Sequence, residues 1–241
     1  MAFLLVFIPV FAFADDVSNA SSVSDVSDVS SQAVVSDTSE PETEPVITSG
    51  NAIVVMSVET GQILLNTANG REVDPTCATK LMTAMLAFDM ANGLDNQVTV
   101  DAEALKNIGK KGDISAPMLG LRAGNTATVR QLLQATLISA ANDACNALAY
   151  SVSGGDIAGF VEKMNARAAE IGCEHTYFTN TTGLYDGEAY TTVEDVAKIA
   201  AAFYRYNPLL DISSQPTYVI GGSTIHTKNY LRSETLMRGC T

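Results

Sequence analysis

Basic residues are scarce in this sequence, and none occurs among the first 49 residues. The 241 residues include 14 Lys and Arg against 27 Asp and Glu, which gives a formal net charge of −13. A protein that binds nucleic acid needs a basic surface to neutralise phosphate groups. The charge balance therefore argues against a nucleic-acid partner and indicates a soluble, acidic protein.

Metal-ligand spacing is also lacking. The cysteines are Cys77, Cys145, Cys173 and Cys240, and the histidines are His175 and His226. None of these residues follows the short spacing of a zinc site, so we expect neither a metal nor a cofactor. Cys145 and Cys173 fit either core thiols or a disulfide, since four cysteines allow three complete pairings.

No hydrophobic run is long enough to span a bilayer. Residues 2–13 are apolar and end in Ala-Phe-Ala followed by two Asp residues. This pattern is typical of a secretory signal and its cleavage site, which predicts a signal peptide over residues 1–14. The basic segment that normally precedes such a run is missing, so the signal is expected to be truncated. A buried N-terminal strand or helix is the alternative, and export would place the protein outside the cell or in the cell envelope.

Low complexity marks the next segment. Residues 15–49 are dominated by Ser, Asp, Val, Glu, Thr and Pro, and they carry an unbalanced negative charge. Such a composition cannot bury enough apolar surface to fold, which predicts a disordered acidic linker. The folded part is expected to be a single domain over residues 50–241.

The folded part begins with strand patterns and continues mainly with helix patterns. An apolar strand over 52–58 and a return over 62–65 predict a hairpin. Helices are expected from Thr76, from the capping box at Thr128, from near Ala144, from Asp156 and from Thr192. A short strand is expected over 217–220. This order favours an α+β fold with a helical subdomain over a regular βαβ repeat.

Cys77 and Lys80 form the chemical centre of the sequence. Pro75 favours a helix start, and Cys77 and Lys80 are then one turn apart on the same helix face. A helix N-terminus and a neighbouring ammonium both stabilise a thiolate, so the pair could form an activated nucleophile. The alternative is a buried structural cysteine beside a surface lysine.

Together with five further segments in order, this centre resembles the serine-type D-alanyl-D-alanine carboxypeptidases, low-molecular-weight penicillin-binding proteins. The family's first motif, Pro-Ala-Ser-x-Thr-Lys, here reads Pro-Thr-Cys-Ala-Thr-Lys over 75–80, so Cys77 takes the nucleophile's position. The second motif, Ser-x-Asn, places Ala140 at the serine and Asn142 at the asparagine, with Ser139 one position early. The remaining segments lie at residues 59–62, 180–184, 190–192 and 227–231.

The resemblance implies a β-lactamase/transpeptidase-like fold with a helical subdomain and an antiparallel sheet. It also implies attack on the carbonyl between two D-Ala residues, formation of an acyl-enzyme and hydrolysis of that intermediate. Cys77, Lys80 and Asn142 would be the catalytic residues, and Ser139 and Ala140 would lie at the substrate. The third motif, Lys-Thr-Gly, does not occur before Thr241. We therefore expect an incomplete sheet that lacks its C-terminal strands, and a chain that is marginally stable or prone to aggregate.

Two functions of different classes remain open. The first is an exported peptidase of peptidoglycan stem peptides ending in D-Ala-D-Ala, with β-lactams as further ligands and Cys77 as nucleophile. The second is a catalytically silent homologue that binds peptidoglycan peptides or a partner protein, because Ala140 cannot relay a proton. A secreted helical domain without any site is a third reading, which the ordered motifs disfavour.

Overall fold

The structure is a computed structural model, and it describes residues 3–8, 52–110 and 116–226. The predicted linker over 15–49 and the segment 227–231 lie outside the described residues. The helices are α1 (Thr76–Met90), α2 (Val129–Ile138), α3 (Asn142–Val152), α4 (Ile157–Glu170), α5 (Val193–Tyr204), α6 (Asn207–Ser213) and the 3-10 turn η1 (Glu103–Leu105). The strands are β1 (Phe3–Ile8), β2 (Ala52–Ser57), β3 (Ile63–Asn66), β4 (Glu72–Val73), β5 (Gln97–Thr99), β6 (Thr126–Thr128), β7 (Thr191–Thr192), β8 (Thr217–Ile220) and β9 (Ser223–His226).

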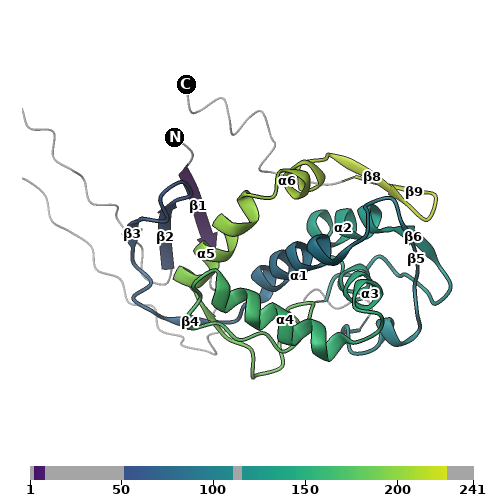
Figure 1. The fold of residues 1–241 in the computed structure, drawn as a ribbon, viewed down its shortest axis with the longest axis horizontal. Coiled ribbons are helices and arrows are strands. Elements are labelled where there is room, and N and C mark those ends of the chain that lie inside the picture. The colour runs from purple at the N-terminus through teal and green to yellow at the C-terminus, as the bar shows by residue number, and fades with distance from the viewer. Residues whose placement is uncertain (1–2, 9–51, 111–115, 227–241) are drawn as a thin grey trace, which may run out of the picture.

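A small antiparallel sheet in the order β1-β2-β3 forms one end of the molecule (Figure 1). The β2–β3 hairpin confirms the prediction from the sequence. Helix α5 packs against β2, and alternate residues of the strand face it. The buried side chains of this contact are Ala52, Val54, Met56, Val58, Ala68, Val193, Ala197 and Ala201. Most of them are small, so the helix can lie close to the sheet.

Strand β1 pairs antiparallel with β2 along its whole length, from Phe3 opposite Ser57 to Ile8 opposite Ala52. These are the apolar residues in which the sequence predicts an export signal. In this structure they form an edge strand of the sheet, as in the alternative prediction of an N-terminal strand. The pairing does not test whether the segment is later removed, so the signal peptide stays a prediction.

Helix α1 runs through the middle of the helical part and contacts α2, α3, α4 and α5 (Figure 1). Because α1 has neighbours on most sides, its residues Met82, Ala84 and Ala87 are fully buried. Large core side chains from the neighbouring elements include Leu132, Leu133, Leu148, Phe160, Phe178 and Ile199. A helix this deeply buried holds its first turn in a fixed place, and that turn carries Cys77.

Most predicted helix starts agree with the structure. The Thr128 capping box has both of its hydrogen bonds, and Asp156 and Thr192 cap α4 and α5. Helix α3 begins at Asn142, two residues before the predicted start near Ala144, and the Asn142 N–H donates to Pro117 O at 2.7 Å and fixes the chain there. Helix α6 was not predicted, since its seven residues are too few for a periodic pattern.

Candidate active site

Cys77 lies in the first turn of α1 and is exposed. The interpretation of Cys77 as a buried structural cysteine is therefore wrong. Thr76, directly before it, has φ of +26°, a value that β-branched residues rarely adopt. Backbone strain of this kind persists only where the surroundings impose it, and it is common at functional sites. In this first turn the Thr76 N–H donates to Asp74 Oδ1 at 3.1 Å, and the N–H groups of Ala78 and Thr79 donate to the carbonyl oxygen of Pro75 at 2.8 and 3.4 Å. The helix N-terminus therefore acts on the thiol through its dipole.

Lys80 reaches a loop that is distant in sequence. Its Nζ donates to the carbonyl oxygen of Thr182 at 2.5 Å. The loop is held in shape by Asn180, whose Oδ1 accepts from the N–H groups of Thr182 and Gly183 at 3.1 and 2.7 Å. Lys80 is therefore positioned one turn below Cys77 by a backbone acceptor, which sequence reasoning did not foresee, although it did single out residues 180–184 as a matching segment.

Gly183 allows this loop to approach the start of α1. Its φ is +71°, and a Cβ at this position would lie 2.1 Å from the carbonyl oxygen of Thr76. Any other residue would therefore push the loop away from α1. The loop and the strained residue before Cys77 thus form one packed unit.

Cys145 is a second thiol close to Lys80, but it is buried and free. Its Sγ donates to the carbonyl oxygen of Thr181 at 3.1 Å, and the Thr83 hydroxyl donates to the same oxygen at 2.8 Å. Burial raises the pKa of Cys145 to about 11, although the charge of Lys80 acts in the opposite direction. Cys145 is therefore a protonated core thiol, and Cys173 is likewise buried and free, with its pKa raised by burial to about 12.

The turn between α2 and α3 holds the other candidate residues. Ala140 has φ of +52°, the left-handed conformation, and Asn142 is the first residue of α3. The left-handed residue of this turn is therefore Ala140 and not Asn142. Asn142 is buried, and its Nδ2 donates to the carbonyl oxygen of Ile108 at 3.1 Å. Its Oδ1 is also buried and has no hydrogen-bond partner among the described residues.

Ser139, one position before Ala140, has a hydrogen-bond partner from a distant strand. Its Oγ lies 2.6 Å from the hydroxyl of Tyr218 on β8, and the two groups form a hydrogen bond. Burial raises the pKa of Tyr218 above its ordinary value, and the charge of Asp143 adds to this effect, whereas the bond to Ser139 opposes it. Tyr218 and Ser139 therefore form a pair of neutral hydroxyl groups. The sequence did not indicate Tyr218 as the partner of Ser139.

Asp143 connects the start of α3 to the preceding loop. Its carboxylate accepts hydrogen bonds from the N–H groups of Leu119, Gly120 and Leu121 at 2.7 to 3.1 Å. The residue is buried, so these donors compensate for the loss of water around the carboxylate. The hydrogen bonds of Asp143 and of the Asn142 N–H therefore hold the start of α3 against residues 117–121.

The structure thus brings Cys77 and Lys80 together on α1, and it packs α1 against α3, which begins with Asn142. Within the described part of the chain, none of the five candidate residues hydrogen-bonds to another. No group of three or more His, Cys, Asp and Glu side chains that could hold a metal occurs among the described residues. Among these same residues, no helix combines the length and the apolar character needed to cross a membrane.

The overall arrangement is that of the transpeptidase-like fold of penicillin-binding proteins. A crystal structure of a D-alanyl-D-alanine carboxypeptidase from Mycobacterium tuberculosis H37Rv is similar with a TM-score of 0.66 and 26% identity, over 75% of this chain and 67% of that one. A mutant form of the Streptomyces K15 DD-transpeptidase is similar with a TM-score of 0.65 and 26% identity, over 75% of each chain.

Sequence comparison gives the family. The D-alanyl-D-alanine carboxypeptidase family profile matches residues 37–237. The carboxypeptidase DacF of Bacillus subtilis is 29% identical over 65% of this chain, and DacB2 of Mycobacterium tuberculosis is 30% identical over 68%. The chain belongs to the D-alanyl-D-alanine carboxypeptidase family. It spans 39% and 54%, respectively, of the lengths of these two relatives.

Proposed function

We propose that this exported or envelope-associated protein binds peptidoglycan stem peptides ending in D-Ala-D-Ala and is acylated by them at Cys77. The observation that carries the proposal is the exposed thiol in the first turn of α1, with Lys80 one turn on and anchored to Thr182. An exposed thiol at a helix N-terminus, one turn from an ammonium, is the environment of a reactive cysteine. The family's relatives, which are named as D-alanyl-D-alanine carboxypeptidases, support the substrate class.

In the proposed step, the Sγ of Cys77 forms a bond to the carbonyl carbon of the penultimate D-Ala. The peptide C–N bond then breaks, the terminal D-Ala leaves as the amine, and the thiol proton ends on that amine. Water later hydrolyses the thioester to release the shortened peptide and the free thiol. The Oδ1 of Asn142 is buried and unpartnered among the described residues, so it would contact a bound peptide only after the chain around it moves aside.

Proton delivery to the leaving amine is the weak point of this site. Ala140 has no hydroxyl, and the Ser139 hydroxyl is bound to Tyr218. Loss of a positioned proton donor typically lowers a rate on the order of 10²–10⁴-fold. These two observations favour the second candidate function, a protein that binds the peptide and turns over very slowly or not at all.

The test is labelling of the full chain with a fluorescent penicillin. Acylation at Cys77 should give a label that mass spectrometry places in the peptide containing residue 77, and that neutral hydroxylamine removes because it is a thioester. Cys77→Ala should not be labelled, whereas Cys77→Ser should form a label that resists hydroxylamine.

The outcomes separate the two functions. A label on Cys77→Ser but none on the unchanged chain would show an intact binding site in which sulfur does not react, which supports the silent homologue. The absence of a label on both, together with no binding of a D-Ala-D-Ala peptide, would overturn the proposal.

A further inference from the structure

A polar cavity of about 440 Å³ lies apart from Cys77, beside the loop that anchors Lys80. Its volume is within the range of small-molecule sites. It is bordered by η1, by α3, by the start of α4 and by residues 179–182 of the loop. Most of the side chains that line it are neutral amides and hydroxyls. The polar ones used below are Asn107, Asn146, Tyr150, Asn180 and Thr181.

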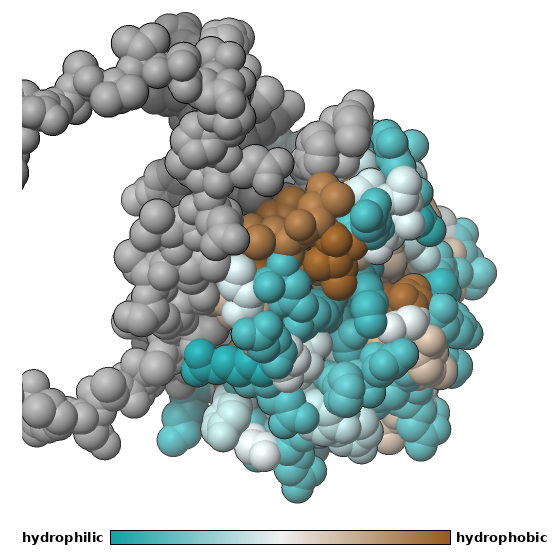
Figure 2. Space-filling view, turned by 90° about the vertical axis from the view of Figure 1, so that its left-hand side faces the viewer, coloured by the Kyte–Doolittle hydropathy of each residue, from teal (hydrophilic) through white to brown (hydrophobic). Residues whose placement is uncertain are grey.

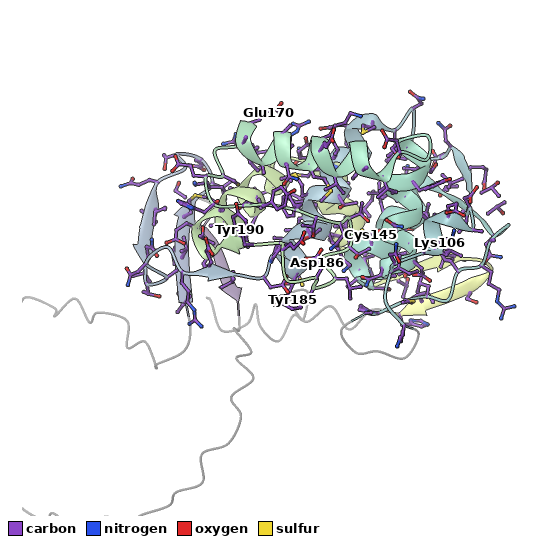
Figure 3. All side chains as sticks on the ribbon, turned by 90° about the horizontal axis from the view of Figure 1, so that it is seen from below. Lys106, Cys145, Glu170, Tyr185, Asp186 and Tyr190 are labelled. Carbon is purple, nitrogen blue, oxygen red and sulfur yellow. The ribbon has the colours of Figure 1, made fainter. Side chains whose placement is uncertain are left out.

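One wall of the cavity is rigid because its polar groups are satisfied. The Asn146 Nδ2 donates to the carbonyl oxygen of Ala104 at 2.8 Å, and its Oδ1 accepts from the Thr181 hydroxyl at 2.6 Å. On the loop side, the side chains of Thr179 and Asn180 both bind the carboxylate of Asp186. Figure 3 labels Lys106, which lines the cavity, and Asp186, which binds the lining residues Thr179 and Asn180. This wall is therefore preorganised and fixes the shape of the cavity.

Two other polar groups that line the cavity have no hydrogen-bond partner among the described residues. They are the hydroxyl of Tyr150 and the side-chain amide of Asn107. The Tyr150 ring packs against the backbone of Gly155, where a Cβ would lie only 3.2 Å from the ring. Asn107 has φ of +57°, which presents its side chain from a tight turn. The cavity thus offers a fixed ring, one hydroxyl and one amide to a ligand.

The charges at the rim favour a neutral ligand. The only ionisable lining groups besides Tyr150 are Glu103 and Lys106, and these form an ion pair at 2.6 Å. A charged ligand would have to compete with this pair. A ligand with many hydroxyl groups, in contrast, matches amides and hydroxyls that both donate and accept.

We propose that this cavity binds a neutral N-acetylated sugar unit. The Tyr150 ring would pack against the apolar face of the sugar ring, its hydroxyl would bind a sugar hydroxyl, and the Asn107 amide would pair with the acetamido group. The choice of an acetamido sugar among neutral polar ligands rests on the proposed function, since the glycan of peptidoglycan carries such groups. The site itself is defined by the lining residues alone.

The test is a ligand-observed NMR titration of the full chain with N,N′-diacetylchitobiose, with cellobiose as the sugar lacking acetamido groups. N,N′-Diacetylchitobiose should bind saturably and more tightly than cellobiose. Tyr150→Phe keeps the ring and removes the hydroxyl, and Asn107→Gly removes the amide but tolerates the positive φ. Each variant should weaken chitobiose binding about 3- to 10-fold, the effect of one neutral hydrogen bond.

Matched controls lie outside the cavity. Tyr204 is an exposed tyrosine of α5, and Asn69 is an exposed asparagine with φ of +52°. Tyr204→Phe and Asn69→Gly should leave the affinity unchanged. Absence of saturation at concentrations on the order of 10 mM, or equal binding by both cavity variants and the unchanged chain, would overturn the site. Equal binding of cellobiose would overturn the acetamido assignment.

The titration is independent of the chemistry at Cys77. It should give the same affinity with Cys77→Ala, which cannot be acylated. Sugar binding without penicillin labelling would reject only the proposed function, and labelling without sugar binding would reject only this site.

Discussion

At residue 140 the chain has a methyl group where the family's motif has a hydroxyl. Ala140 also has a φ of +52°, which costs a non-glycine residue on the order of 1 kcal/mol. The position therefore lacks a proton donor and carries backbone strain at the same time. The two deficits can be separated by substitution.

Ala140→Ser should accelerate acylation of Cys77 by a penicillin by a factor on the order of 10², because it supplies a hydroxyl for proton transfer. Ala140→Gly is the matched control, since it relieves the strain without adding a hydroxyl. The measurement is the rate of label formation under single-turnover conditions. An equal rise in both variants would assign the effect to the backbone and would refute the role of the hydroxyl.

Gly183→Ala should lower the free energy of unfolding by about 3 kcal/mol or more, since it combines a positive φ with a Cβ placed 2.1 Å from the Thr76 carbonyl oxygen. Gly187→Ala is its control, because Gly187 also has a positive φ, +84°, but its Cβ would meet nothing closer than 3.9 Å. That control should lose only about 1 kcal/mol. Urea denaturation measures both values, and equal losses would show that the close contact with α1 is unimportant.

In the first turn of helix α5, the buried carboxylate of Asp195 ties the helix to residues 175–176. The Asp195 side chain accepts hydrogen bonds from the His175 N–H at 2.7 Å, the Thr176 hydroxyl at 2.9 Å and Lys198 Nζ at 2.8 Å. Burial by itself raises the pKa of Asp195, but the hydrogen bonds from Lys198, His175 and Thr176 outweigh it, so the pKa lies below its ordinary value. The charged form is therefore the one that stabilises the fold.

A lowered carboxyl pKa contributes stability that is present above the unfolded value of about 3.8 and is lost as the pH falls through the lower folded value. We expect the free energy of unfolding to decrease on acidification below about pH 4, and Asp195→Asn to flatten part of that decrease. Asp195→Asn should also cost about 1–3 kcal/mol at neutral pH. Thermal melts between acid and neutral pH measure both effects, and an unchanged acid slope in the variant would contradict the assignment.

Elements with local signals could be predicted from the sequence, and elements without them could not. Thr128 and Asp156 mark helix starts because their side chains bind N–H groups within the next three residues. The two-residue strands β4 and β7 pair across more than a hundred residues, so no local pattern marks them. Cys77 and Lys80 were found because they share a helix. The acceptor for Lys80 and the partner of Ser139 were missed, since both come from distant segments.

At the scale of the whole molecule, the side that bears β3 exposes apolar surface (Figure 2). Ile63 and Leu64 of β3 are 39% and 49% exposed. Contiguous apolar surface on a sheet is a site of association. The expectation that the chain is marginally stable or prone to aggregate therefore stays a prediction with a visible physical basis.

Replacing Ile63 and Leu64 with Lys should reduce self-association of the chain, because both side chains are exposed and neither belongs to a buried core cluster. Val219→Lys, at a residue of β8 that is 51% exposed, is the control and should have little effect. Static light scattering during heating gives the comparison. A cooperative, reversible melt of the unchanged chain without scattering would contradict the expectation.

The short loop at residues 179–184 contacts both Lys80 and the polar cavity. Its Thr182 carbonyl oxygen holds the ammonium of Lys80, and its first residues border the polar cavity. A substitution that displaces this loop would therefore disturb the anchor of Lys80 and the wall of the cavity at the same time. Effects on the two places can be told apart only by substitutions outside the loop, such as those of Tyr150 and Cys77.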